Sequence, residues 1–142
     1  MRIRVEQRQP DASSFQGSSI VNMSSTVGLK GSSVDPLYSM TKGGITTFTK
    51  STAIEFGNKA YRIRVNSVHP GAVETEMAAQ HRKVKSNDPA AVEAARQAIA
   101  TSLPIKRVGM PADVAAAVVF LASDESGFMT GSSLIIDGGA MA

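Results

Sequence analysis

A tyrosine and a lysine, Tyr38 and Lys42, stand four residues apart in the sequence. In a helix, positions i and i+4 lie on one face, so the two side chains would be neighbours. A nearby ammonium lowers the pKa of an acid. A tyrosine tuned in this way could give or take a proton near neutral pH. Most such pairs are only neighbours on a helix surface, so the spacing alone leaves the chemistry open.

Two further groups come where predicted strands end. Ser24 and Ser25 follow one apolar run, and Pro70 and Gly71 follow another. Open α/β sheets place their chemistry at the carboxyl ends of the strands. We therefore expect a serine, the tyrosine, the lysine and the proline-glycine turn to converge on one crevice.

The first half of the chain is expected to contain one strand and one long helix. The run Ser19–Met23 is short and apolar, which is typical of a strand buried on both faces. The glycine- and serine-rich stretch 26–34 is expected to be a loop. A helix should follow over residues 35–57, with Asp35 as its cap, Pro36 at its first position and Gly57 near its end. The adjacent Gly43 and Gly44 within it suggest close approach of another backbone or of a ligand.

The second half continues the alternation of strands and helices. Residues 61–69 are expected to form a strand, 88–103 a helix that starts at Asp88, 110–123 a buried apolar helix, and 132–139 a short strand. Strands separated by helices indicate parallel βαβ units in an α/β sheet. A further weak strand is suggested by "RIRV", residues 2–5.

Composition restricts the class of protein. The 142 residues suit one domain, and the chain has no cysteine and only two histidines, which argues against disulfides and metal sites. The net charge of +3 is dispersed and aromatic residues make up 5%, so we expect no nucleic-acid binding. No apolar run approaches the ~20 residues of a membrane helix. With no apolar signal core at the N-terminus, we expect a cytoplasmic protein.

Several motifs in order make the sequence resemble the C-terminal, catalytic half of the classical short-chain dehydrogenase/reductase family. They are "GSSIVNMSS", Tyr38-x-x-x-Lys42 with Ser25 thirteen residues before the tyrosine, "RVNSVHPGAVETEM", and residues 105–139. A lone Y-x-x-x-K is uninformative, but the whole set at this spacing is specific. The resemblance covers residues 17–142 and implies a partial Rossmann-type, doubly wound parallel sheet of about three strands.

The resemblance also implies roles for particular residues. Tyr38 would be the general acid/base, Lys42 would assist it and bind the nicotinamide ribose, and Ser25 would hold the substrate oxygen. The cofactor would be NAD or NADP, and the substrate a small alcohol or carbonyl compound. Residues 76–103 would form a mobile lid over the substrate. The implied cofactor-binding residues are Met23, Tyr38, Lys42, Pro70, Gly71, Ala72, Val73 and Thr75.

Other polar residues have simpler interpretations. Thr75 could cap the next helix, with or without a cofactor contact. His69 precedes a proline, so packing or a backbone effect is expected of it. His81 is expected to be a solvated surface residue, and Asp137 to cap or pair. The apolar run 114–121 is expected to be core.

The sequence departs from the family in its first part. The family's T-G-x-x-x-G-x-G turn, which receives the pyrophosphate at a helix N-terminus, does not occur among the twelve glycines. The N-N-A-G strand end, the catalytic asparagine and the residue that selects NAD or NADP are also missing, and residues 1–16 show no resemblance. We therefore expect a truncated form whose activity alone is weak or absent.

Three interpretations of function remain open at this stage. The first is an oxidoreductase, or its catalytic portion. The second is a non-enzymatic remnant or interaction module that oligomerises, since family members associate through the tyrosine-bearing helix and through the last helix and strand. The third, a nucleic-acid binder, has only the net charge in its favour. An open edge at the strand 19–23 could be covered by "RIRV", by a second copy or by a separate N-terminal half. We favour a homo-oligomer.

Overall fold

A computed structural model of the chain describes residues 17–85 and 88–142. The expectations for residues 1–16, including the "RIRV" strand, lie outside the described residues, as does the side chain of His81. The described part contains a sheet of three parallel strands in the order β1 (Ser18–Met23), β2 (Ile63–Pro70) and β3 (Ser133–Ile136). The predicted α/β class with about three parallel strands is confirmed.

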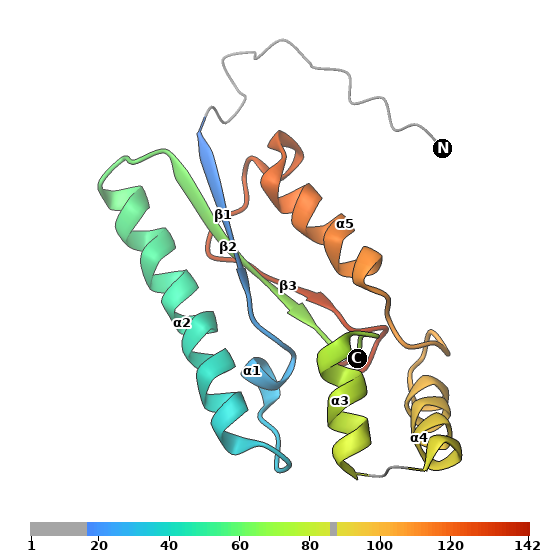
Figure 1. The fold of residues 1–142 in the computed structure, drawn as a ribbon. Coiled ribbons are helices and arrows are strands. Elements are labelled where there is room, and N and C mark those ends of the chain that lie inside the picture. The colour runs from blue at the N-terminus through green and yellow to red at the C-terminus, as the bar shows by residue number, and fades with distance from the viewer. Residues whose placement is uncertain (1–16, 86–87) are drawn as a thin grey trace.

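Helices lie on both faces of this sheet (Figure 1). The long helix α2 (Pro36–Asn58) receives a hydrogen bond at Thr49 Oγ1 from Asn22 of β1. The helix α5 (Pro111–Ala122) accepts one at the Leu121 carbonyl from Ser19 of the same strand. Since side chains three positions apart in a strand point to opposite faces, α2 and α5 cover opposite sides.

The remaining helices lie beyond the carboxyl ends of the strands (Figure 1). They are α1 (Val27–Lys30), α3 (Glu76–Lys85) and α4 (Pro89–Ser102), and a single 3₁₀ turn, η1 (Asp124–Ser126), follows α5. The helix α1 replaces part of the loop expected over 26–34, because a four-residue helix has too few residues to show a period. The helix α3 was not predicted and occupies the first part of the expected lid.

Local start signals are confirmed at two helices. Asp35 Oδ1 accepts a hydrogen bond from Tyr38 N at 2.8 Å and caps α2, and Asp88 Oδ1 accepts one from Ala90 N at 3.0 Å and caps α4. The expected end at Gly57 is early by one residue, since α2 runs through Asn58. A Cβ added at Gly57 would meet no atom within 4 Å, so steric crowding does not end the helix at this residue.

Burial differs from the expectation at two elements. The strand β1 is not buried on both faces: Ile20 is 39% and Met23 46% exposed, because β1 is the edge of the described sheet. The helix α5 is not wholly core either, since only Leu121 is buried and Val119 is 67% exposed. The central strand β2 is the one buried throughout, from Arg64 to His69.

The described residues lack two features, a membrane-spanning helix and a metal-binding cluster of side chains. None of the helices there combines the length and the apolarity that crossing a bilayer requires. No group of three or more histidine, aspartate and glutamate side chains within the described part could hold a metal ion.

Candidate active site

The two serines at the end of β1 point in different directions. Ser24 is buried, and its hydroxyl donates to the Lys42 carbonyl at 2.9 Å and lies 3.2 Å from Thr46 Oγ1, so it fastens the strand end to α2. The Ser25 hydroxyl is half-buried and lies 3.4 Å from both the Pro70 carbonyl and Val27 N. These two contacts are long for a hydroxyl. Ser25 therefore keeps a hydroxyl that is free to bond another partner.

Tyr38 and Lys42 are in the first turns of α2, one turn apart. The Lys42 ammonium lies 5.5 Å from the centre of the Tyr38 ring, which is cation–π distance. The same ammonium donates to the Met23 carbonyl at 3.0 Å. Both side chains are partly exposed, and Tyr38 Oη makes no hydrogen bond to another described residue. The lysine thus joins the tyrosine to the carboxyl end of β1.

A close approach of α1 to α2 places Lys42. A Cβ on Gly28 would lie 2.7 Å from both the carbonyl carbon and the carbonyl oxygen of Lys42. Real Cβ atoms do not approach backbone so closely, so only glycine fits at this position. A Cβ added at Gly43 would lie 3.6 Å from the Gly28 carbonyl oxygen, an ordinary contact, and one added at Gly44 would meet nothing within 4 Å, so no tight backbone approach requires either glycine. Close approach of a ligand at these glycines stays a prediction.

The loop after β2 lies beside these residues. The Pro70 carbonyl accepts hydrogen bonds from Thr26 N at 3.1 Å and, at longer range, from the Ser25 hydroxyl. Gly71 packs on Asp137, whose Cβ would lie 2.7 Å from a Cβ added at Gly71. Asp137 Oδ1 accepts from Gly139 N at 2.9 Å, so this aspartate forms a turn at the end of β3, as expected.

The base of the expected lid is closed by backbone pairing. Gly109 N donates to the Ala72 carbonyl at 2.9 Å, and Glu74 N donates to the Gly109 carbonyl at 2.8 Å, so Val73 and Gly109 form an isolated parallel bridge. Thr75 is exposed, and its Oγ1 accepts from Ala78 N at 3.2 Å at the start of α3. The capping interpretation of Thr75 is therefore confirmed.

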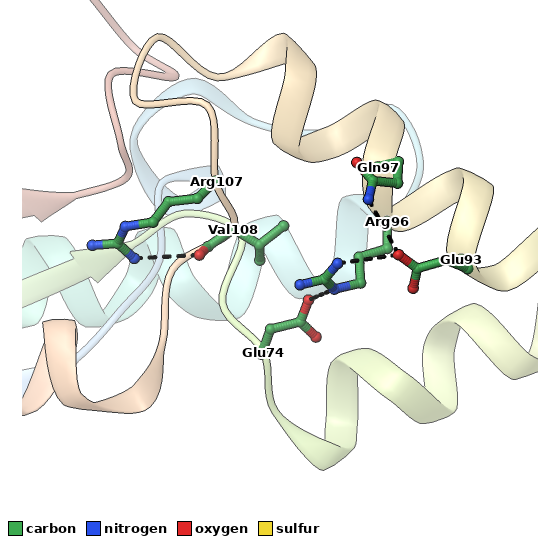
Figure 2. Close-up of polar contacts among 6 residues, drawn as sticks. All are labelled: Glu74, Glu93, Arg96, Gln97, Arg107 and Val108. Atoms are coloured by element: carbon green, nitrogen blue, oxygen red, sulfur yellow. Dashed lines mark hydrogen bonds and ion pairs between the residues drawn. The ribbon is translucent and has the colours of Figure 1, made fainter.

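An ion pair connects α4, which lies in the segment expected to form a lid, to this loop (Figure 2). Arg96 Nε donates to Glu74 Oε1 at 2.7 Å, and Arg96 Nη1 donates to Glu93 Oε1 at 3.2 Å. The hydrogen bond that Arg96 donates to Glu74 and the charges of Glu93 and Glu74 raise the pKa of Arg96. Sequence reasoning missed this pair, because Glu74 and Arg96 are 22 residues apart and Arg96 belongs to none of the motifs identified in the sequence.

A second ion pair lies where the chain enters α5. Arg107 holds Asp113 through two hydrogen bonds of 2.6 and 2.9 Å, and Met110 N donates to Asp113 Oδ2 at 2.7 Å. The Arg107 guanidinium and the Met110 amide lower the pKa of Asp113 to about 2. This carboxylate therefore caps α5 while it is ionised.

His69 is buried completely beneath the serine. Its Nδ1 lies 3.0 Å from the Ser25 carbonyl oxygen, and its Nε2 lies 2.8 Å from Ser67 Oγ. Burial lowers the pKa of His69, the hydrogen bond that the ring donates to the Ser25 carbonyl opposes this, and the charge of Lys50 adds to the lowering. The packing role expected from the sequence thus includes two hydrogen bonds that the sequence did not predict.

A depression lies away from these residues. An open hollow of about 440 Å³ is lined by the C-terminal part of α2, the start of β2 and residues 127–130, including Phe56, Arg62 and Phe128. None of the predicted site residues lines it.

Known proteins match the chain in sequence over most of its length. The family model described as enoyl-(acyl carrier protein) reductase matches residues 7–141, and so begins before Gly17, where we expected the resemblance to begin. The chain is 40% identical over 120 residues to nodulation protein G of Azospirillum brasilense, covering 84% of this chain and 44% of that one. It is 37% identical over 125 residues to the NADP-dependent (R)-specific alcohol dehydrogenase of Lentilactobacillus kefiri, covering 87% and 45%.

Solved structures also match most of the chain. Aldohexose dehydrogenase of Thermoplasma acidophilum matches with a TM-score of 0.80 at 33% identity, over 87% of this chain and 48% of that one. L-sorbose reductase of Gluconobacter frateurii, solved in complex with NADPH and L-sorbose, matches with a TM-score of 0.80 at 29% identity, over 88% and 48%. The chain spans about half the length of the curated relatives that it matches.

Proposed function

Since the chain belongs to the short-chain dehydrogenase/reductase family, we propose that it carries the proton-transfer and nicotinamide-binding residues of an NAD(P)-dependent oxidoreductase. The proposed reaction interconverts an alcohol and a carbonyl group of a small molecule. The observation that supports it most is the position of Lys42. Its ammonium contacts both the Tyr38 ring and the Met23 carbonyl, at the edge of the sheet where α/β proteins bind ligands.

Three side chains share the proposed chemistry. The cofactor supplies or accepts the hydride at the reacting carbon. In the reductive direction the Tyr38 hydroxyl gives its proton to the substrate oxygen, and in the oxidative direction the Tyr38 phenolate takes a proton from the alcohol. The Lys42 ammonium lies 5.5 Å from the centre of the Tyr38 ring and so belongs to the same site. Ser25 donates a hydrogen bond to the substrate oxygen and thereby orients the substrate. The Ser25 hydroxyl can do so because its contacts within the protein are long.

The residues present fit the nicotinamide end of the cofactor. Lys42 and Tyr38 offer partly exposed donors that suit ribose hydroxyl groups. Thr75 uses an acceptor lone pair to cap α3, and its hydroxyl proton stays available for a cofactor group. The backbone of residues 70–73 is half-buried beside them. We extend the cofactor role to Met23, Pro70, Gly71, Ala72 and Val73 on this basis.

We further propose that these 142 residues by themselves bind NAD(P) weakly and turn over slowly. They contain no glycine-rich turn for the pyrophosphate. Binding energy from the remote part of a cofactor normally holds the reactive part in place. The expected result is slow or undetectable turnover at saturating NADH or NADPH, and turnover at rates ordinary for the family would contradict it.

A cofactor titration tests the site. NADH and NADPH are titrated separately and nicotinamide fluorescence is recorded for the wild type, Tyr38→Phe and Lys42→Ala. Weak binding by the wild type that both substitutions weaken further would support the site. The chain offers a matched control in Tyr61 and Lys59, where the ammonium lies 5.7 Å from the ring centre at the other end of α2. Tyr61→Phe and Lys59→Ala should leave the binding unchanged, and an equal effect of all four substitutions would contradict the site.

The exposed face of α2 supports a second candidate, an oligomerising module. Four large apolar side chains on this helix are more than three-fifths exposed: Leu37, Met40, Phe48 and Ile54. We propose that a second copy of the chain covers them in a homo-oligomer. Light scattering after size-exclusion chromatography should give more than one protomer for the wild type and one for Phe48→Glu. An oligomer without any cofactor binding would favour a non-enzymatic module, and a wild-type monomer would contradict this candidate.

A further inference from the structure

The hydrogen bonds of His69 define which nitrogen carries its proton. A carbonyl oxygen can only accept, so Nδ1, at 3.0 Å from the Ser25 oxygen, must be the N–H. Burial lowers the pKa of the ring, which favours the neutral form with Nε2 as an acceptor. Ser67 Oγ, 2.8 Å away, then donates its single proton to Nε2 and leaves its 3.4 Å contact to the Ser132 carbonyl unused. Every polar atom of the buried ring is thereby satisfied.

The position of the Ser25 hydroxyl depends on the main chain of Ser25. The Ser25 hydroxyl donates to the Pro70 carbonyl at 3.4 Å, beyond the usual range of about 2.5–3.0 Å for a hydroxyl donor. It accepts from Val27 N, also at 3.4 Å, beyond the usual range of about 2.7–3.2 Å for an amide donor. The Ser25 carbonyl, in contrast, accepts two good bonds, one from Gly28 N at 3.0 Å and one from His69 Nδ1 at 3.0 Å. The first is local to the turn into α1, and the second ties the serine to β2, 44 residues along the chain.

We propose that His69 is a positioning residue that fixes the Ser25 main chain, and through it the Ser25 hydroxyl, by means of an Nδ1–H imidazole. The relevance of Ser25 to a substrate rests on the proposed function. The hydrogen bonds of the His69 ring do not depend on that function. An apolar side chain of similar volume would fill the same space, but it would leave one lone pair of the Ser25 carbonyl without its partner and the Ser67 hydroxyl with only its 3.4 Å contact to the Ser132 carbonyl.

The tautomer is tested first, in the wild-type chain labelled with ¹⁵N in histidine. The chain has only two histidines, so long-range ¹H–¹⁵N spectra contain two ring systems, and comparison with His81→Asn, which retains His69, assigns them. We expect His69 to show a protonated Nδ1 and a bare Nε2, unchanged from about pH 8 to well below the ordinary histidine range. A bare Nδ1 would overturn the proposal, since it could not donate to Ser25.

Two substitutions then separate positioning from packing. The side-chain amide nitrogen of His69→Asn can lie near the position of Nδ1, whereas that of His69→Gln reaches the position of Nε2. We expect Asn to retain the wild-type ¹³C shifts of Ser25 and its single χ1 rotamer, measured by three-bond couplings. Gln should shift the Ser25 carbonyl resonance and average the rotamer. Ser25 signals that are the same in both variants as in the wild type would overturn the proposal.

Folding of the variants does not limit the test. If circular dichroism shows either variant unfolded, the wild-type tautomer decides the question alone. Neither measurement uses cofactor or substrate, so failure of the NADH titration would overturn the proposed function and leave the His69 result standing. Conversely, a bare Nδ1 on His69 would overturn this proposal and leave the proposed function standing, because cofactor binding does not require the Nδ1–H tautomer.

Discussion

Arg96 of α4 lies 2.7 Å from Glu74, in the loop that follows β2, and so joins this helix to the candidate nicotinamide loop (Figure 2). This contact matters because α4 has no buried residue of its own. The stretch of chain that contains α4 begins and ends at the backbone bridge between Val73 and Gly109. This bridge holds the two ends of the stretch together but not α4 itself. The ion pair is therefore a principal tie between α4 and the site.

Loss of the Arg96 guanidinium should loosen α4. Arg96→Met keeps much of the side-chain length and removes the charge, so hydrogen–deuterium exchange should become faster in residues 89–102. The matched control is Glu93→Gln, which weakens the pair within α4 and retains the bond to Glu74. Unchanged exchange in Arg96→Met, or an equal increase in both variants, would show that other contacts hold α4.

Substitution by alanine should have opposite effects on stability at two glycines, Gly28 and Gly44. Gly28→Ala should destabilise the protein and displace Lys42, because the new Cβ meets the Lys42 backbone at 2.7 Å. Gly44→Ala meets nothing within 4 Å and should stabilise α2 by up to about 1 kcal/mol, since alanine is the better helix former. Urea unfolding of both variants measures the two free energies. A stable Gly28→Ala protein would mean that α1 can move away from α2 at little cost.

Asn66 should be essential for stability. It is fully buried, its Nδ2 donates to the Met129 carbonyl at 2.8 Å, and its Oδ1 accepts from Ser132 N at 3.0 Å. Asn66→Asp places an acceptor against the Met129 carbonyl and should lower the free energy of unfolding by about 2 kcal/mol or more. Asn58→Asp makes the same change at the exposed end of α2 and should have little effect. Similar values for the two variants in urea would refute the role of Asn66.

Asp113 should make stability depend on pH in the acid range. Its pKa in the folded protein is lowered from 3.8 to about 2 by Arg107 and the Met110 amide. The stabilisation is therefore complete above the unfolded value and is lost as the pH falls through the folded value. The melting temperature of the wild type should exceed that of Asp113→Asn near neutral pH, and the difference should shrink between about pH 4 and pH 2. A difference that does not vary with pH would exclude this cause.

Much of the architecture followed from local sequence signals. Asp35 and Asp88 were recognisable as caps because a cap bonds an amide two or three residues away, and the alternation of apolar strands with helices indicated the parallel sheet. The contact of Tyr38 with Lys42 was predictable for the same reason, since a spacing of four residues in a helix brings side chains together. The expected roles of these residues rest on the family resemblance, and their catalytic function stays a prediction.

Contacts between distant parts of the chain were decided by the tertiary structure. The bond from His69 to Ser25 depends on the register of β1 against β2, and that between Arg96 and Glu74 on where α4 packs. The close approach at Gly28 depends on the placement of α1 against α2, and the exposure of Ile20 on which strand forms the edge. Sequence periods describe one element at a time. The sequence alone therefore determined the elements and the helical Tyr38–Lys42 pair, whereas partners across elements were set by how the strands and helices pack together.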